Sequence, residues 1–498
     1  MTYLTVPALV AAAAEEFGEA PALITREDTQ SFSDLDRQVA VAAGALRDRG
    51  IAPGDRVLLA AQNCPRAVHA WLAAMHAGAL PAAVNPELTL PELRYLSLDL
   101  EPALILVDGE RASIGARLAA ELRVDFARID QVEAGGAIAP HEADPAEPAA
   151  IVYTSGTTSR AKGVMVRHSA YTETGFSFPR WIGLGKAERL WACLPLFHIN
   201  AQAYSLMAAL AHGHGLALTP KFQASTFWKD ARELAVTSVN VVGAMLAILE
   251  RQPEERWVKS PLRTIYAAPA PPLAQRKRIE ERFEVRISGG YGMSENTFGC
   301  AESPTSPGRP GSIGRPRQPA SSRFKNELRI VTTEGRDATA GEVGELCFRN
   351  PVMTPGYWNA PEITEKALVD GWLRTGDAGY RDREGDVVLV GRFKEMIRRR
   401  GENIAPGEVE DALLSHPAVS AAAAFGVPSE LSEDQVVAAV VLGDGGVADE
   451  AELKEWASSS LAAFKVPVQI VFRRSLPMTP TLRVARDQLR REFLAGQT

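Results

Sequence analysis

Residues 151–166 read IVYTSGTTSRAKGVMV and carry the strongest local signal in the chain. An apolar strand leads into hydroxyl side chains around Gly156, then the cation Lys162, then a second apolar strand. Backbone N–H groups and hydroxyls in such a turn can surround phosphate oxygens. The pattern is not the GxxxxGK[ST] P-loop, because no second glycine precedes Lys162 and Gly163 follows it. Taken alone, the stretch fits a phosphate site and a solvated hairpin equally well.

Upstream of this stretch, helix-like and strand-like segments alternate. The spacing of apolar residues predicts helices over 34–50 and 66–76 and strands over 55–61, 80–85 and 103–108. Short apolar runs such as ALILVD are typical of strands buried on both faces of a sheet. The alternation predicts α/β layers, with ligands bound at the carboxyl ends of the strands.

Downstream, the pattern changes twice. After a Pro/Gly-rich stretch over 304–319, the runs ELRIV, GELCFRN and DVVLVGR predict a β-rich subdomain. After GRFKEMIRRRG, we expect a helix in EVEDALLSHPAV, strands in AAAAFGVP and QVVAAVVLG, and a helix in EAELKEWASSSLAAF. These last segments predict a small α+β domain, with its boundary near Arg392 to Lys394.

Composition narrows the class of protein. The 498 residues predict roughly two to four folding units. A formal net charge of −7 gives no reason to expect nucleic acid or an anionic membrane as partner. The four cysteines form no CxxC pair, which argues against a zinc ribbon or a disulfide framework and fits a reducing compartment. Glu15 and Glu16 interrupt the Ala-rich N-terminus, which predicts a helix, not a signal peptide, and hence a cytoplasmic protein without a membrane span.

Two further segments suit a nucleotide. In SGGYGMSE, residues 288–295, glycines allow close approach to a flat ring, Tyr291 can stack on it, and Glu295 can hold a Mg²⁺ ion that bridges phosphates. In GWLRTGD, residues 371–377, Asp377 can accept hydrogen bonds from both hydroxyls of a ribose, and Arg392 can reach the same sugar. Considered singly, Asp377 is better explained as a turn residue and Arg392 as a surface cation.

Five motifs in order, YTSGTTSRAKGV, YGMSE, WLRTGD, GRFKEMI and GENIAPGEVE, resemble those of the acyl-adenylate-forming superfamily, which contains the acyl-CoA synthetases. The resemblance runs from about residue 33 to the C-terminus. It implies an N-terminal domain over 1–391 that binds ATP and acid, a hinge over 392–394, and a mobile C-terminal domain over 395–498. It also implies a ligase that uses ATP, Mg²⁺ and CoA to turn a small carboxylic acid into an acyl-AMP and then into a thioester.

The resemblance assigns roles to residues at matching positions. Glu295 is expected to hold Mg²⁺, Ser294 to contact the acid and the α-phosphate, and Gly401 to let the pantetheine arm pass. Lys394 is the expected hinge residue. The residues expected to bind the β- and γ-phosphates are Thr154, Ser155, Gly156, Thr157, Thr158 and Lys162. Those expected at the adenine are Ala268, Gly290 and Tyr291, and those expected at the ribose are Asp377 and Arg392.

The resemblance also places an acid pocket, whose expected lining mixes polar and apolar side chains and so suits a short or polar acid. No aspartate stands near Asn240 to hold the ammonium group of an amino acid. His198 is expected near the reaction centre, with a core-packed histidine as the alternative. The lining comprises His198, Asn200, Gln202, Val241, Gly243, Ala244 and Met245.

The chain departs from the family pattern near its C-terminus, where Leu482 and Arg483 replace a glycine and the catalytic lysine. Arginine keeps the charge but is bulkier and planar. Arg483 can act in place of the lysine, the first half-reaction can be slow, or the acid can be unusual, even an inorganic oxyanion such as nitrite. Transfer to a carrier protein or an amine, and a non-catalytic nucleotide-binding role, remain alternatives. We expect a monomer or homodimer that binds no nucleic acid.

Overall fold

The computed structural model describes residues 4–132, 134–155, 161–305, 309–321, 323–392, 395–399, 402–404, 406–428, 434–443, 445–478 and 484–496. The chain divides into two compact units, which are residues 1–328 with 348–373, and residues 329–347 with 374–498. Helices and strands alternate through most of the first unit, which confirms the expected α/β class. The hinge proposed over 392–394 stays a prediction.

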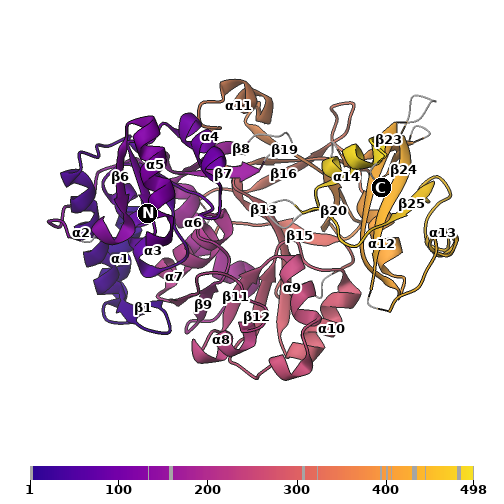
Figure 1. The fold of residues 1–498 in the computed structure, drawn as a ribbon, viewed down its shortest axis with the longest axis horizontal. Helices are drawn as coiled ribbons and strands as arrows, with labels where there is room; N and C mark the ends of the chain where they lie inside the picture. The colour runs from indigo at the N-terminus through magenta and orange to yellow at the C-terminus, as the bar shows by residue number, and fades with distance from the viewer. Residues whose placement is uncertain are drawn as a thin grey trace. The chain divides into compact units, whose positions relative to one another are not determined.

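The first unit contains two sheets and a hairpin (Figure 1). The smaller sheet is parallel in the order β4-β3-β5-β6, with β4 over Leu80–Ala83, β3 over Arg56–Ala60, β5 over Leu104–Val107 and β6 over Asp125–Arg128. In the hairpin, β7 (Pro148–Ser155) pairs antiparallel with β8 (Ala161–Arg167), and β7 packs beside β4.

The larger sheet of this unit has the order β15-β14-β13-β12-β11-β9-β10-β1-β2. Six neighbouring strands run parallel to one another, namely β1, β10, β9, β11, β12 and β13 in sheet order. Strands β2, β14 and β15 each run antiparallel to the strand before them. The strands are β1 Pro21–Ile24, β2 Thr29–Ser31, β9 Arg189–Ala192, β10 Gly215–Leu218, β11 Ser238–Val241, β12 Thr264–Ala267, β13 Arg286–Met293, β14 Asn296–Ala301 and β15 Ser312–Pro316.

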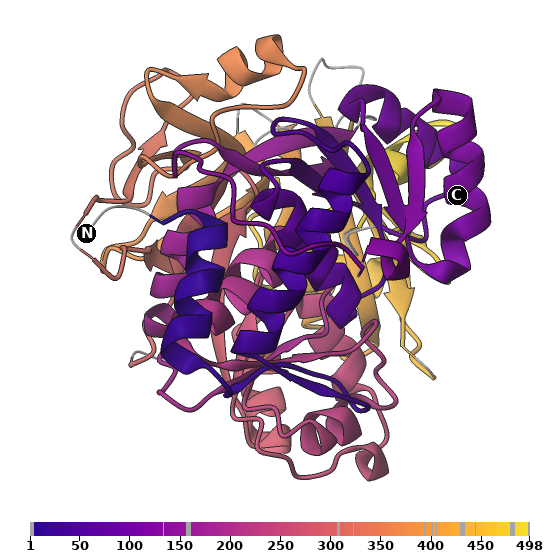
Figure 2. The ribbon, with the colours of Figure 1, turned by 90° about the vertical axis from the view of Figure 1, so that its left-hand side faces the viewer.

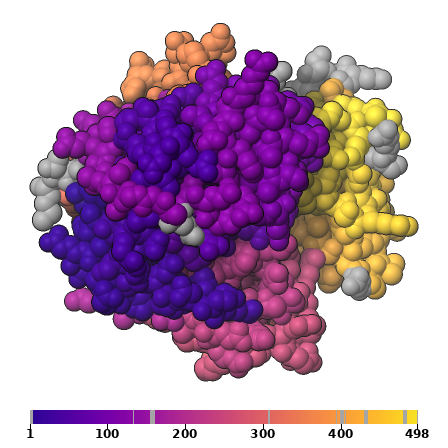
Figure 3. Space-filling view, turned by 60° about the vertical axis from the view of Figure 1, so that its left-hand side comes forward, coloured from indigo at the N-terminus to yellow at the C-terminus, as the bar shows by residue number. Residues whose placement is uncertain are grey.

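Helices α1, α2 and α3 lie beside one another in the first unit (Figure 2), and residues near the N-terminus, in indigo, are exposed on the face shown in the space-filling view (Figure 3). Ser31 and Asp34 fix the start of α2 through a capping box. The helices of this unit are α1 Val6–Phe17, α2 Phe32–Asp48, α3 Pro65–His76, α4 Leu90–Leu100, α5 Ala112–Leu122, α6 His168–Ile182, α7 Met207–His212, α8 Phe227–Glu233, α9 Gly243–Glu250, α10 Leu273–Phe283 and α11 Pro361–Ala367.

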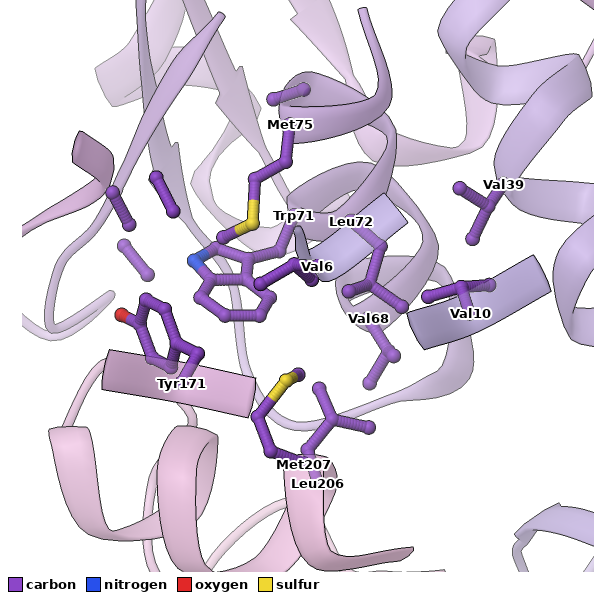
Figure 4. Close-up of a cluster of buried hydrophobic side chains, with 14 of the residues drawn as sticks. Val6, Val10, Val39, Val68, Trp71, Leu72, Met75, Tyr171, Leu206 and Met207 are labelled. Atoms are coloured by element: carbon purple, nitrogen blue, oxygen red, sulfur yellow. The ribbon is translucent and has the colours of Figure 1, made fainter. Parts of the chain in front are cut away.

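The main core of this unit surrounds Trp71 of α3 (Figure 4). Tyr171 of α6 meets the indole edge to face with ring centroids 5.4 Å apart, and Val6 of α1 and Met207 of α7 lie close by. Large aromatic side chains bury much apolar area, so this cluster holds four helices from different parts of the chain together.

The second unit combines a strand ribbon with a small α+β fold. The ribbon follows the order β16-β17-β19-β20, and residues 329–331, 344–347, 374–381 and 387–392 of it belong to this unit. In the α+β part, a three-stranded sheet β23-β24-β25 is covered by α12, α13 and α14. The elements are β16 Glu327–Val331, β17 Gly344–Arg349, β18 Leu368–Val369, β19 Trp372–Arg381, β20 Val387–Arg392, β21 Ile397–Arg399, β22 Glu402–Ile404, α12 Pro406–Leu414, β23 Val419–Pro428, β24 Asp434–Leu442, α13 Glu450–Ser458, β25 Gln469–Phe472 and α14 Arg486–Leu494.

The predicted elements correspond closely to those observed, with two corrections. The helix expected over EVEDALLSHPAV ends at Leu414 and Val419 already begins β23, because Pro417 cannot continue a helix. The helix expected over EAELKEWASSSLAAF ends at Ser458, earlier than predicted. Ser458 Oγ and Ser459 Oγ donate to the carbonyls of Glu455 and Trp456 at 2.7 and 2.6 Å. Serine side chains that bond to nearby carbonyls compete with the helix, so the run of serines ends it.

Within the described ranges, no helix is both long and apolar enough to cross a membrane. All four cysteines lie among the described residues, and none of them forms a disulfide there.

Candidate functional site

The carboxyl ends of four neighbouring parallel strands meet at one edge of the larger sheet. Strand register pairs Val241 of β11 with Ala267 of β12, and Ala267 with Gly289 of β13. The predicted adenine residues Ala268 and Gly290 come one position later on these strands, and α9 begins at Gly243 just after β11. The segment that carries His198 and Asn200 follows β9, which pairs with β11. The fold therefore gathers the predicted adenine and acid residues along one edge.

The hydroxyl-rich stretch lies in the β7–β8 hairpin, where Thr154 pairs with Lys162 and Ser155 with Ala161. Gly156, Thr157 and Thr158 lie outside the described residues. The two strands that frame the turn are thus as predicted, and the phosphate-binding role of the turn stays a prediction.

Ser294 and Glu295 form the tight turn of the β13–β14 hairpin, since Met293 pairs with Asn296 on either side of them. Both side chains are 8% exposed. Oε1 of Glu295 accepts a 2.8 Å hydrogen bond from the Tyr357 phenol, and its carbonyl accepts one from Thr354 N at 2.9 Å. The expected metal carboxylate is therefore buried and held in orientation.

The same tyrosine connects this turn to the β7–β8 hairpin. Nζ of Lys162 lies 5.6 Å from the centroid of the Tyr357 ring, a cation–π distance. Lys162 and Glu295, 133 positions apart in sequence, are thus brought together by a residue that sequence reasoning did not identify. Tyr357 stands in PGYWNAP, and no local pattern there indicated its partner.

The donor set at this turn suits Mg²⁺. The described residues contain no group of three or more His, Cys, Asp or Glu side chains that could hold a metal ion. Mg²⁺ commonly takes only one or two protein carboxylates and completes its shell with substrate phosphates and water. A single oriented carboxylate at Glu295 with Lys162 nearby meets that need.

Asp377 and Arg392 lie opposite each other on β19 and β20. Arg392 Nε lies 2.9 Å from Asp377 Oδ1, and its Nη1 donates to Thr375 O at 3.2 Å. Gly376 has a φ of +71°, in the left-handed region that glycine tolerates, and it places Asp377 next to the turn. Asp377 is 8% exposed, so the second unit contains a preformed carboxylate–guanidinium pair at the predicted ribose positions.

His198 lies in the loop after β9, half-buried beside Phe197, with ring centroids 4.5 Å apart. Burial lowers the pKa of His198 from 6.5 to about 4. Its imidazole is therefore neutral at neutral pH and can donate a hydrogen bond to a reacting oxygen without adding a charge.

The other predicted pocket residues fall into two groups. Asn200 begins a π-helix over Asn200–Leu206, and its Oδ1 is buried without a hydrogen-bond partner among the described residues. Gln202 is 1% exposed; it accepts from Tyr171 at 2.7 Å and donates to Leu196 O at 2.8 Å, so its amide stabilises the loop and is not presented to a ligand. Of the rest, Val241 and Met245 are buried, and Gly243 and Ala244 are half-buried.

Tyr291, the predicted adenine residue, is 9% exposed, and its ring stacks on Phe348 at 6.2 Å with an interplanar angle of 16°. One face of the ring is thereby fixed by Phe348. The predicted residues Lys394, Gly401 and Arg483 lie outside the described residues.

The residues on either side of the segment that carries Arg483 pair with each other. Met478 and Val484 form an isolated antiparallel bridge, and Ala485 N donates to Pro477 O at 2.8 Å. Arg486 follows directly. Its Nη2 donates to Glu410 Oε2 at 2.8 Å and its Nη1 to Glu395 Oε2 at 2.9 Å. Sequence reasoning did not identify this half-buried ionic group.

The chain is similar to known proteins over most of its length. Residues 10–358 match the family model of AMP-binding enzymes, and residues 408–482 match the AMP-binding enzyme C-terminal domain. A sulfoacetate–CoA ligase from Cupriavidus necator is 32% identical over 501 residues, 97% of each chain. An oxalate–CoA ligase from Arabidopsis thaliana is 32% identical over 477 residues, 91% of each chain. The solved structure of ATP-bound MatB from Rhodopseudomonas palustris, 25% identical, has a TM-score of 0.90 over 98% of this chain and 99% of that one.

Proposed function

The chain belongs to the family of AMP-binding enzymes, and on that premise we propose that it activates a small carboxylic acid as its acyl-AMP and transfers the acyl group to CoA. It is an AMP-forming acid–thiol ligase that uses ATP, Mg²⁺ and CoA. The observation that carries this proposal is the junction of Lys162, Tyr357 and Glu295, which joins a phosphate-type hairpin to a metal-type carboxylate.

In the first half-reaction, a carboxylate oxygen of the acid bonds to the α-phosphorus of ATP, and the bond from that phosphorus to the bridging oxygen breaks, which releases pyrophosphate. Lys162 and the hydroxyls of the hairpin bind the departing phosphates. Glu295 would hold Mg²⁺, which neutralises phosphate charge when bound. The protein contributes position and charge, which suffice for phosphoryl-type chemistry.

Neutral His198 is suited to orient the acid by a hydrogen bond, and Asp377 with Arg392 to bind the ribose hydroxyls. Arg483 takes the place of the family lysine as the cation between the carboxylate and the α-phosphate. In the second half-reaction, the CoA sulfur attacks the acyl carbon as its proton leaves, and AMP departs. A hinge over 392–394 would let residues 395–498 serve both steps.

Three features of the biology complete the proposal. The acid is small, in keeping with the polar groups at His198 and Asn200 and with relatives named for sulfoacetate and oxalate. The enzyme acts in the cytoplasm, where ATP and CoA are both available, as a monomer or a homodimer. CoA is the acceptor, with a carrier-protein thiol or an amine as the alternatives.

The deciding experiment is acid-dependent release of pyrophosphate from ATP, run over short-chain, aromatic, amino and inorganic acids, nitrite included. We expect release with a small acid, followed by a CoA thioester identified by product mass. Parallel reactions with a phosphopantetheinyl protein and a small amine identify any other acceptor. If ATP binds but no acid provokes release, the catalytic proposal is wrong and a nucleotide-binding role replaces it.

A further inference from the structure

Arg317 is a buried cation with no carboxylate partner among the described residues. The residue is 2% exposed. Its Nη1 donates to Thr297 O at 3.3 Å, its Nη2 donates to the Tyr266 phenol, and its Nε has no hydrogen-bond partner within the described residues. By contrast, buried Arg276 is paired with Glu302 at 2.6 Å.

Three aromatic rings surround this guanidinium. Its carbon lies 4.8, 5.1 and 5.2 Å from the ring centroids of Trp181, Tyr204 and Tyr266. A cation–π contact stabilises a desolvated cation by about 2 kcal/mol or more. Burial of an ion costs several kcal/mol, and the contacts leave the positive charge itself without a counter-charge. A buried positive charge without a counter-charge favours binding of an anion nearby.

The guanidinium lies directly behind the strand that carries the predicted adenine residues. A Cβ on Gly290 would lie 2.5 Å from the Tyr266 hydroxyl and 2.7 Å from Arg317 Nη2, and a Cβ on Gly292 would lie 2.5 Å from the Tyr204 hydroxyl. Glycine at positions 290 and 292 is therefore required by the close approach of Arg317 and its tyrosines. No other residue fits without moving them.

Tyr204 connects Arg317 to the predicted acid pocket. It belongs to the π-helix that begins at Asn200, and it follows Asn200 by about one turn, so both residues occupy the same side of that helix. Asn200 contributes a second buried polar atom without a partner in the described part of the chain. Its carboxamide can present either oxygen or NH₂ groups, because the two orientations exchange by a flip.

We propose that Arg317 determines specificity by favouring an acid that carries a second anionic group, such as a short dicarboxylate or a sulfocarboxylate, with the NH₂ of Asn200 as a hydrogen-bond donor to that group. This inference rests on the proposed function and names its substrate class. The charge acts through a low-dielectric interior, so it attracts an anion in the pocket without direct contact. The expected preference over an uncharged analogue of the same shape is about 10- to 100-fold.

The test uses pairs of acids that differ only in the second charge. These are malonate with malonamate, succinate with succinamate, and 3-sulfopropanoate with 3-sulfamoylpropanoate. For the wild-type protein we expect kcat/KM for pyrophosphate release to be about 10- to 100-fold higher for the charged member of at least one pair. Equal rates, or a preference for the amides, would overturn the inference while leaving the ligase activity established. If none of the acids provokes pyrophosphate release, the proposed function itself is wrong.

Arg317→Met then assigns the preference to the guanidinium. It should reduce the charge preference to near unity by slowing the charged acid, with little change for the amide. An equal loss for both members of a pair would overturn the role of Arg317. The matched control is Arg276→Met, which also removes a buried arginine and should leave the charge preference unchanged. If Arg317→Met does not fold, Arg317→Lys and Asn200→Ala supply the comparison, and a full preference retained in both would contradict the proposal.

Discussion

The Tyr357 phenol donates a 2.8 Å hydrogen bond to Glu295 Oε1, and the ring of the same residue lies 5.6 Å from Lys162 Nζ. One side chain thus orients the carboxylate expected to hold the metal and supports the cation expected to hold phosphate. Loss of a group that orients a metal ligand typically costs about 10- to 100-fold in metal affinity or activity.

Tyr357→Phe removes the hydrogen bond and keeps the ring under Lys162. We expect the Mg²⁺ concentration for half-maximal pyrophosphate release to rise about 10-fold, with a smaller change in the KM for acid. Titration of Mg²⁺ at saturating ATP measures this. Tyr153→Phe is the control, because it removes another phenol bound to a carboxylate, that of Asp99 at 2.6 Å. An unchanged Mg²⁺ requirement in Tyr357→Phe would contradict the positioning role.

Asp377→Asn tests the ribose assignment. Hydrogen bonds to a charged group contribute about 1.5–3 kcal/mol, so the KM for ATP should rise by about 10- to 150-fold. The wild type should discriminate against 2′-deoxy- and 3′-deoxy-ATP, and the variant should lose that discrimination, which a structural role would not affect. Asp337→Asn, which breaks the exposed pair with Arg329, is the control in the same unit. Equal discrimination in Asp377→Asn and wild type would show that the ribose binds elsewhere.

Arg483 replaces the catalytic lysine of related enzymes, and its variants test whether it does the same work. Arg483→Ala should slow acid-dependent pyrophosphate release by at least about 100-fold, because a charge is lost where negative charge concentrates. CoA consumption from a supplied acyl-AMP should change much less. Arg483→Lys should retain or raise the first rate. Complete loss of acid-dependent pyrophosphate release in Arg483→Lys would mean that the planar guanidinium has a specialised role.

Buried histidines predict loss of stability in acid. Burial lowers the pKa of His69, His168 and His214 from 6.5 to about 4. Because the folded-state pKa lies below the unfolded one, unfolding takes up protons between about pH 6.5 and 4, and stability falls as pH falls through that window. Each such group contributes a slope of about 1.4 kcal/mol per pH unit.

His214→Leu isolates one of these groups. His214 is 1% exposed and neither ring nitrogen has a hydrogen-bond partner among the described residues, so the substitution should be tolerated at pH 7.5. Denaturant unfolding at several pH values should show a shallower decline below pH 6.5 than in the wild type. The same slope in both proteins would mean that His214 does not titrate as its burial requires.

The elements of the fold could be predicted where the information is local. The apolar spacing over 34–50 and 66–76 corresponds to α2 and α3 within two residues at each end, because periodicity and caps act over a single turn. The serine run that ends α13 at Ser458 is equally local. The apolar spacing nevertheless predicts a longer helix, because it does not reveal that serine side chains bond to backbone carbonyls.

The site was predictable only where chemistry is concentrated in one motif. Glu295 and Asp377 each stand beside glycines in a short stretch, and the resemblance gave them roles. Tyr357 and Arg317 stand in no such motif. Tyr357 contacts Glu295 across 62 positions of sequence, and Arg317 is buried although its Pro/Gly-rich stretch is typical of an exposed loop. Such partners depend on the tertiary fold, which no local pattern encodes.

The ionic group of Arg486 with Glu395 and Glu410 has a mechanical consequence. Glu395 comes directly after the proposed hinge, and Arg486 comes directly after the loop that carries Arg483. Because one guanidinium bonds to both carboxylates, it holds the residue after the proposed hinge to the residue that follows the Arg483 loop. Within the proposed hinge motion, residues 395, 410 and 486 would therefore travel as one piece, so a substitution in this trio would loosen the support of the Arg483 loop without changing any group assigned to a substrate.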